Sequence, residues 1–158
     1  MPAQKFFKGP VGFMVWMAAA AVLLLPAAML VYRATTGDDF RDAEIMAQWS
    51  SHFSDVQTPE ALSGDENDWE HVWKLNREAV PEWPEQAESF AAFYAGSRPT
   101  GGYRAEAVIE YQDSSVVRVA CRVHPPEGPA IMVITSPWVT AVLSGLGGRS
   151  LELVHCSP

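Results

Sequence analysis

The chain has 158 residues, a formal net charge of −8 and two cysteines. A surface with this excess of acid repels nucleic acid and anionic lipid, so we expect no nucleic-acid partner.

Residues 11–32 form one apolar run without a charged side chain. As a helix the run would reach roughly 33 Å, enough for a hydrocarbon core of ~30 Å, whereas a signal peptide has a shorter apolar region. Lys5 and Lys8 precede the run, which places residues 1–10 in the cytoplasm by the positive-inside rule. The sequence therefore predicts a protein of the bacterial inner membrane, anchored by residues 11–32, with its C-terminal domain in the periplasm and lipid around the anchor.

Small side chains gather in the middle of this run, at Ala18, Ala19, Ala20 and Ala21. Such residues let another helix approach closely, so they are a candidate helix-packing face. The alternative is that alanine merely lowers the bulk of the anchor. The first interpretation predicts that the anchor packs within an integral membrane protein complex.

The next segment, residues 33–88, is strongly acidic and is expected to be helical. Ile45, Trp49, Phe53 and Val56 recur at spacings of four, four and three, which predicts an amphipathic helix over 42–56. The following stretch, from Thr58 to Asp68, contains proline, glycine and several acids and should be a loop. A second short helix is predicted where the sequence reads DWEHVWKLN.

Acidic side chains are densest at Asp65, Glu66, Asp68 and Glu70. This cluster is a candidate acidic patch for a basic periplasmic protein such as a c-type cytochrome. The alternative is that these carboxylates only keep the domain soluble.

From Ser89 onward the apolar pattern changes to a period of two, which is typical of strands with one dry and one wet face. The two predicted helices would then cover the dry face. The predicted fold class is α+β: a single N-terminal transmembrane helix followed by a small antiparallel β-sheet domain, residues 89–158, covered by two short helices. The six strand candidates are residues 89–96, 103–112, 115–123, 130–136, 138–144 and 150–156.

The two cysteines, Cys121 and Cys156, both lie in strand candidates. Adjacent strands could bring them together in a disulfide, but two buried free thiols are an equally open alternative.

Residues with catalytic or metal-binding chemistry do not form a recognisable pattern. The four histidines show no metal-ligand spacing with another histidine or a cysteine. A glycine-rich stretch at 145–148 is not followed by a predicted helix, so it does not suggest a phosphate site. We therefore expect a protein that is not an enzyme and that has no metal or cofactor.

A glycine-rich loop joins the first two strand candidates and reads GSRPTGGY over 96–103. Together with DWEHVWKLN before it and PPEGPAIMVITSPW after it, this loop resembles the PrcB-like family, which is named for a protein that stabilises a protease complex. The resemblance covers about residues 67–145. It implies a β-meander and a binding role rather than a particular partner.

Within that loop, proline fixes φ and the glycines permit conformations closed to other residues, so the loop should be rigid. A rigid loop loses little entropy on binding. The alternative is a simple strand connection with Tyr103 in the core. The candidate protein-binding loop consists of Arg98, Pro99, Thr100, Gly101, Gly102 and Tyr103.

Three loops are also similar to those of chagasin-type cysteine-protease inhibitors: Pro99–Tyr103, residues 136–138 and the glycine stretch 145–148. In this chain, however, the glycine loop comes last rather than between the other two.

Two functions follow from these observations. The first is a membrane-anchored, non-catalytic accessory subunit that binds and stabilises a larger membrane protein complex, respiratory or photosynthetic, from the periplasmic side. The second is a PrcB-like stabiliser or inhibitor of an extracytoplasmic protease, acting through the Pro99–Tyr103 loop.

Overall fold

The computed structural model describes residues 41–157. The predicted anchor at 11–32, with its alanine face at Ala18–Ala21, lies outside this range. Among residues 41–157 no helix is both long enough and apolar enough to cross a membrane. The elements are β1 (Glu44–Ser51), β2 (Pro59–Gly64), a single 3-10 turn η1 (Glu66–Asp68), α2 (Trp69–Asn76), β3 (Ser89–Ala95), β4 (Arg104–Gln112), β5 (Val116–His124), β6 (Trp138–Ser144) and β7 (Ser150–Ser157).

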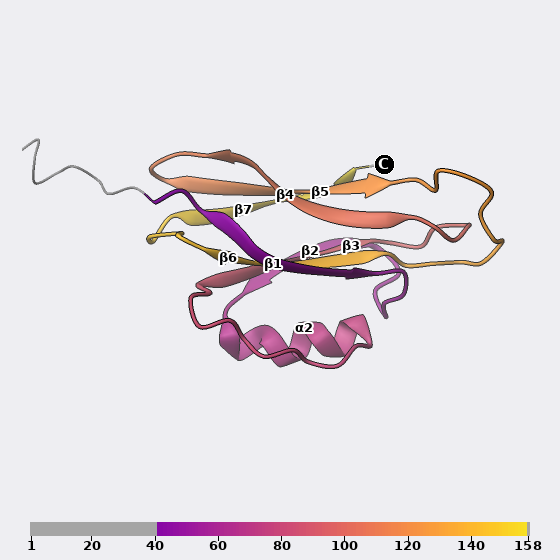
Figure 1. The fold of residues 1–158 in the computed structure, drawn as a ribbon, viewed down its shortest axis with the longest axis horizontal. Helices are drawn as coiled ribbons and strands as arrows, with labels where there is room; N and C mark the ends of the chain where they lie inside the picture. The colour runs from indigo at the N-terminus through magenta and orange to yellow at the C-terminus, as the bar shows by residue number, and fades with distance from the viewer. Residues whose placement is uncertain (1–40, 158) are drawn as a thin grey trace, which may run out of the picture. The chain divides into compact units, whose positions relative to one another are not determined.

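The seven strands form two sheets, one in the order β1-β6-β3-β2 and the other in the order β4-β5-β7. The sheets face each other, and α2 lies on the outer face of the four-stranded sheet (Figure 1). One apolar core fills the space between the sheets and includes Phe93, Val119 and Leu143. A second core lies between the four-stranded sheet and α2.

The central strands β3 and β6 serve both cores, and this explains their nearly continuous apolar sequences. In β3, Ala91 and Phe93 belong to the core between the sheets, whereas Ala92 and Tyr94 belong to the core beneath α2. The alternation expected of a strand is therefore present, but it separates two dry faces. The predicted wet face exists on β4 and β5, where exposed residues such as Arg104 and Arg122 alternate with buried ones.

Tryptophan dominates the core beneath α2. The helix buries Trp69, Val72 and Trp73 on one side, and their spacing of three and four residues places them on one face. The rings of Trp73 and Trp138 meet edge to face, with centroids 5.5 Å apart. Such aromatic pairs contribute beyond the area that they bury, so α2 is held to the sheet mainly by these rings.

Beneath the same helix lies a buried polar network. The hydroxyl of Tyr94 donates to Oδ1 of Asn76 at 2.9 Å, and Nδ2 of Asn76 donates to Oγ1 of Thr140 at 3.2 Å. Burial, with a smaller effect from the charge of Glu60, raises the pKa of Tyr94. The tyrosine therefore remains a neutral donor, and the last turn of α2 is tied to both central strands.

The predicted α+β class is wrong, because the described part of the chain is mostly β-sheet with one short helix. The main error is at residues 42–56, where β1 replaces the predicted helix and pairs with β6. A β-bulge between Ile45 and Ala47 reverses the faces of the strand. Ile45 therefore packs between the sheets while Trp49 packs beneath α2, so the two apolar residues lie on opposite faces of one strand rather than on one face of a helix.

Three further differences concern the sheet. Residues 59–64, predicted as loop, form the edge strand β2, whose first residue is a proline and so needs no donor there. Residues 130–136, predicted as a strand, make only an isolated bridge between Thr135 and Arg98. Finally, β7 runs parallel to β5, so the three-stranded sheet is mixed rather than antiparallel.

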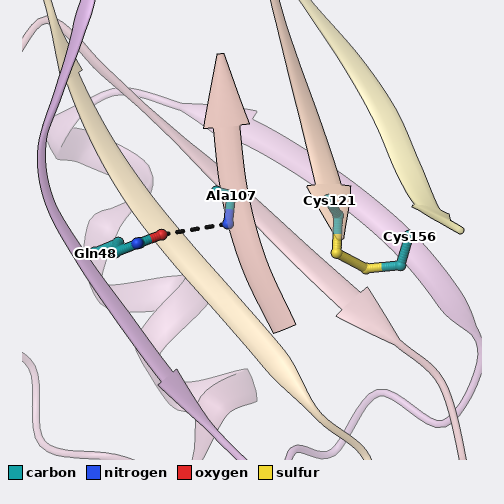
Figure 2. Close-up of a disulfide and its surroundings, with 4 residues drawn as sticks. All are labelled: Gln48, Ala107, Cys121 and Cys156. Carbon is teal, nitrogen blue, oxygen red and sulfur yellow. Dashed lines mark hydrogen bonds between the residues drawn. A yellow bond between two sulfur atoms is a disulfide. The ribbon is translucent and has the colours of Figure 1, made fainter. Parts of the chain in front are cut away.

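Side chains join the strands beyond the main-chain pairing. Oε1 of Gln48 in β1 accepts a hydrogen bond from the backbone N–H of Ala107 in β4 at 3.2 Å. This contact links the edges of the two sheets (Figure 2).

Cys121 in β5 and Cys156 in β7 form a disulfide with their Cα atoms 4.4 Å apart. Residues 41–158 form a compact unit with cores of its own, which is the property of a domain that folds alone.

Asp113 closes the turn between β4 and β5. Its carboxylate accepts hydrogen bonds from the backbone N–H groups of Ser115 and Val116, and from the hydroxyls of Tyr111 and Ser115. These bonds, with that from the Ser115 amide the strongest influence, hold the pKa of Asp113 well below its ordinary value. The turn is therefore ordered most strongly when this carboxylate is charged.

The first prediction concerns this turn. Because the pKa of Asp113 is depressed on folding, its stabilisation is complete above the unfolded-state value of about 4 and is lost as the pH falls below it. We expect Asp113→Asn to be less stable at pH 7 and to lose less stability than the wild type on further acidification. Urea unfolding across this pH range measures both effects. Ser114→Ala serves as the control, and identical pH slopes in the wild type and Asp113→Asn would contradict the prediction.

Candidate binding site

Three loops meet at one end of the sandwich, and we call this region the loop end. It consists of residues 52–58 after β1, 96–103 between β3 and β4, and 125–137 between β5 and β6 (Figure 1). Hydrogen bonds join all three. The backbone N–H of Ser136 donates to the carbonyl of His52 at 2.8 Å, and Nδ1 of His52 lies 2.8 Å from the carbonyl oxygen of Tyr103.

The predicted binding loop, Arg98–Tyr103, is fastened along the third of these loops. Arg98 and Thr135 exchange backbone hydrogen bonds of 2.7 and 3.0 Å, and the N–H of Gly101 donates to the carbonyl of Ile131 at 3.0 Å. The hydroxyl of Thr135 donates to the carbonyl of Thr100 at 3.0 Å. Residues 98–101 and 131–135 therefore form one hydrogen-bonded unit, which we call the braced structure. These bonds restrict the motion of the Pro99–Tyr103 loop.

Arg98 and Tyr103 stack within this loop. The guanidinium carbon of Arg98 lies over the Tyr103 ring, 5.8 Å from its centroid. The Nε atom of Arg98 is buried and has no hydrogen-bond partner within residues 41–157. Tyr103 is half-buried, so it is neither a fully exposed contact residue nor part of the core.

Sequence analysis missed the main apolar feature of the loop end. Ile131, Met132 and Ile134 are 74%, 87% and 69% exposed, and we call these three residues the apolar patch. The run AIMVITS is rich in β-branched residues, and this composition predicts a strand. The signal against that assignment was the proline and glycine content on both sides, including Pro129 and Pro137.

Beside the patch is a polar pocket of about 620 Å³, lined by His52, Gly102, Arg104, His124 and the Pro125–Glu127 segment. His124 lies within 2.9 Å of a carboxylate oxygen of Glu106. Within the described residues, Arg104 takes part in no ion pair. The pocket therefore places the side chains of His52, Arg104 and His124 together at the loop end.

Gly102 provides the second prediction. Its φ of +86° is unfavourable for other residues, and an added Cβ would lie 2.8 Å from Cβ of Pro126. We expect Gly102→Ala to lower the free energy of unfolding by about 1–2 kcal/mol. Thermal or urea unfolding measures this loss. The matched control is Gly128→Ala in the same end of the molecule, where an added Cβ meets no atom within 4 Å, and an equal loss in both variants would contradict the argument.

The candidate acidic patch lies around the start of α2, away from the binding loop in sequence and structure. Asp65 accepts a hydrogen bond from the N–H of Asn67, and Glu70 forms an exposed ion pair with Lys74 at 2.8 Å. This hydrogen-bonded pairing lowers the pKa of Glu70. Acidic residues at a helix N-terminus also stabilise the helix, because they compensate the partial positive charge of its dipole there. Part of the cluster therefore has a local structural role.

The three chagasin-like loops do not come together. Pro99–Tyr103 and residues 136–138 lie at the loop end, whereas 145–148 joins β6 to β7 at the opposite end. There, an added Cβ on Gly145 would lie 2.7 Å from the carbonyl oxygen of Asp42, just before β1. Glu88 also accepts hydrogen bonds from the N–H groups of Gly145 and Gly147. The three loops therefore do not form one site.

The family model described as PrcB C-terminal matches residues 89–144. This region begins with β3 and ends with β6, so it contains both loops of the braced structure. The match confirms the PrcB-like resemblance predicted from the sequence, over about a third of the chain. No significant match was found among curated proteins or among solved structures.

Proposed function

We propose, from the PrcB C-terminal match over residues 89–144, that this chain is a non-catalytic accessory protein that binds and stabilises a protease through its loop end. The observation that carries the proposal is the apolar patch beside the predicted binding loop. Ile131, Met132 and Ile134 lie within four successive residues of one loop, and large aliphatic side chains exposed close together are typical of a protein interface.

The braced structure also suits a binding role. The main chain of residues 98–101 is already paired with that of residues 131–135, so docking would order few additional bonds. A preorganised surface loses less conformational entropy on binding than a flexible one.

The disulfide supports a location outside the cytoplasm, where such bonds persist. A protease partner would then be secreted or periplasmic. The other hypothesis, an accessory subunit of a respiratory or photosynthetic complex, depends on residues 11–32, which lie outside the described range. We therefore favour the protease partner over a membrane complex or a c-type cytochrome.

Purification of the tagged protein from its native host, in mild detergent, tests this function. We expect a peptidase to co-purify with the wild type and to be lost with Met132→Asp, which changes a side chain that is 87% exposed. Val80→Asp is the matched control, because Val80 is also exposed but follows α2. Recovery of the protein alone, or of a complex without a peptidase, would overturn the proposal.

A further inference from the structure

The loop end differs from the rest of the domain in charge. Residues 41–157 carry 17 acidic and 8 basic side chains. Only two of the acidic ones, Asp55 and Glu127, lie in the three loops, and Asp55 is already paired with Arg77. The acidic excess lies in residues 41–88, so an acidic partner is repelled by that part of the domain and meets little repulsion at the loop end.

Arg98 is the basic residue that these loops contribute. Stacking on Tyr103 fixes the plane of its guanidinium, and its Nε atom is buried. The two terminal nitrogens remain as the donors available to a ligand. A planar guanidinium held in this way is suited to a carboxylate, which can accept two parallel hydrogen bonds.

The apolar patch lies next to this arginine, because the loop that carries the patch is hydrogen-bonded to the loop that carries Arg98. Ile134 precedes Thr135, whose backbone is bridged to that of Arg98, and Ile131 accepts the bond from Gly101. A partner that reaches Arg98 would thus also meet exposed aliphatic side chains. Burial of these side chains would supply binding energy, while the arginine would select the charge.

We propose that Arg98 binds a side-chain carboxylate of the partner while Ile131, Met132 and Ile134 pack against aliphatic side chains beside it. The docking segment of the partner is accordingly acidic and aliphatic. This inference rests on the proposed function, because it specifies what the same loop end recognises. A basic segment would instead be drawn to the acidic body of the domain.

Titration of ¹⁵N-labelled residues 41–158 with short capped peptides tests the inference by NMR. The probe is acetyl-Ile-Leu-Glu-Leu-Ile-amide, and the comparison peptides carry glutamine or lysine in place of glutamate. We expect amide shifts in residues 98–103 and 131–135, with about fivefold tighter binding of the glutamate peptide than of the glutamine one. A glutamine peptide with a free C-terminal carboxylate distinguishes a terminal from a side-chain source.

Variants then assign the preference to one residue. Arg98→Gln should remove the preference for glutamate, and Arg98→Lys should retain part of it because the charge remains without the planar fork. Arg122→Gln, which removes a charge from the outer face of β5, should keep the full preference. Equal effects of Arg98→Gln and Arg122→Gln, or a preference for the lysine or free-terminus peptide, would overturn the inference.

The outcomes separate this inference from the proposed function. Shifts at the loop end that are the same for all peptides would leave loop-end docking in place and exclude an acidic partner segment. Shifts confined to other elements, or no shifts with any peptide, would exclude the acidic segment, and the peptidase co-purification would then decide the function independently.

Discussion

Replacing both Cys121 and Cys156 with alanine is expected to lower the free energy of unfolding by about 4 kcal/mol. The bridge closes a segment of 35 residues, and a cross-link of that span restricts the unfolded chain by roughly this amount in the chain-entropy description. The effect should be felt most in β7, because this edge strand pairs only with β5. Chemical denaturation of the wild type and the double variant measures the difference.

Reduction provides the matching control. The wild type in excess dithiothreitol should approach the stability of the double variant, and the variant itself should not respond to dithiothreitol. Cys121 is 3% exposed whereas Cys156 is half-buried, so a thiol should reduce the folded domain by attack on the sulfur of Cys156, and reduction should become faster once the domain opens. A wild type whose stability is the same with and without reductant would contradict the prediction.

Replacing Arg149 with methionine is expected to cost about 3 kcal/mol, because several hydrogen bonds to a charged group are lost together. The residue is 9% exposed. Its Nε donates to the carbonyl of Leu146 at 2.8 Å and its Nη2 to that of Arg41 at 2.8 Å, with a further bond to Gly145. Nη1 donates to Oε1 of Gln112 at 3.2 Å.

These bonds tie three chain segments at the end opposite the loop end. Equilibrium unfolding in urea measures the loss, and hydrogen exchange at the start of β1 should increase. Arg118→Met is the matched control. Arg118 forms an ion pair with Glu152 at 2.9 Å in which both side chains are largely exposed, so about 0.5 kcal/mol is expected there. Similar losses in the two variants would show that burial of Arg149 is unimportant.

Parts of this fold could be predicted from the sequence because local pattern and tertiary environment agree. The strands from β3 to β5 follow the apolar pattern, and α2 follows from the spacing of Trp69, Val72 and Trp73. The direction of β7 could not be predicted in this way. Parallel and antiparallel edge strands have the same alternation, and the pairing of β7 with β5 is set by how the chain returns from β6.

The errors occurred where one pattern fits two structures. Ile45 and Trp49 are four residues apart, which would place them on one face of a helix or of a regular strand, but the bulge between them sends them to opposite faces of β1. The run that contains Ile131 and Met132 has the composition of a strand, but no neighbouring strand is available to it. Its backbone is instead satisfied by the loop at Arg98, a contact that only the three-dimensional arrangement reveals.

The sequence alone is enough to identify the candidate binding loop, but it does not identify the apolar patch beside that loop. Pro99 and the two glycines are unusual in order and spacing, so a single chain is enough to single them out. The exposure of Ile134 depends on which face of the loop remains at the surface after packing. The periodicity of the sequence does not predict that face.

The pairing of β1 with β6 has a consequence for synthesis of the protein. Glu44 pairs with Ser144, so the first strand meets its partner only after about 100 further residues have been made. At roughly 5–20 residues per second this delay is about 5–20 s, during which the apolar side chains of β1 have no sheet to join. Contacts of such long range also slow folding itself. The apolar side chains of β1 should therefore stay without their partner strand until β6 is also available for folding.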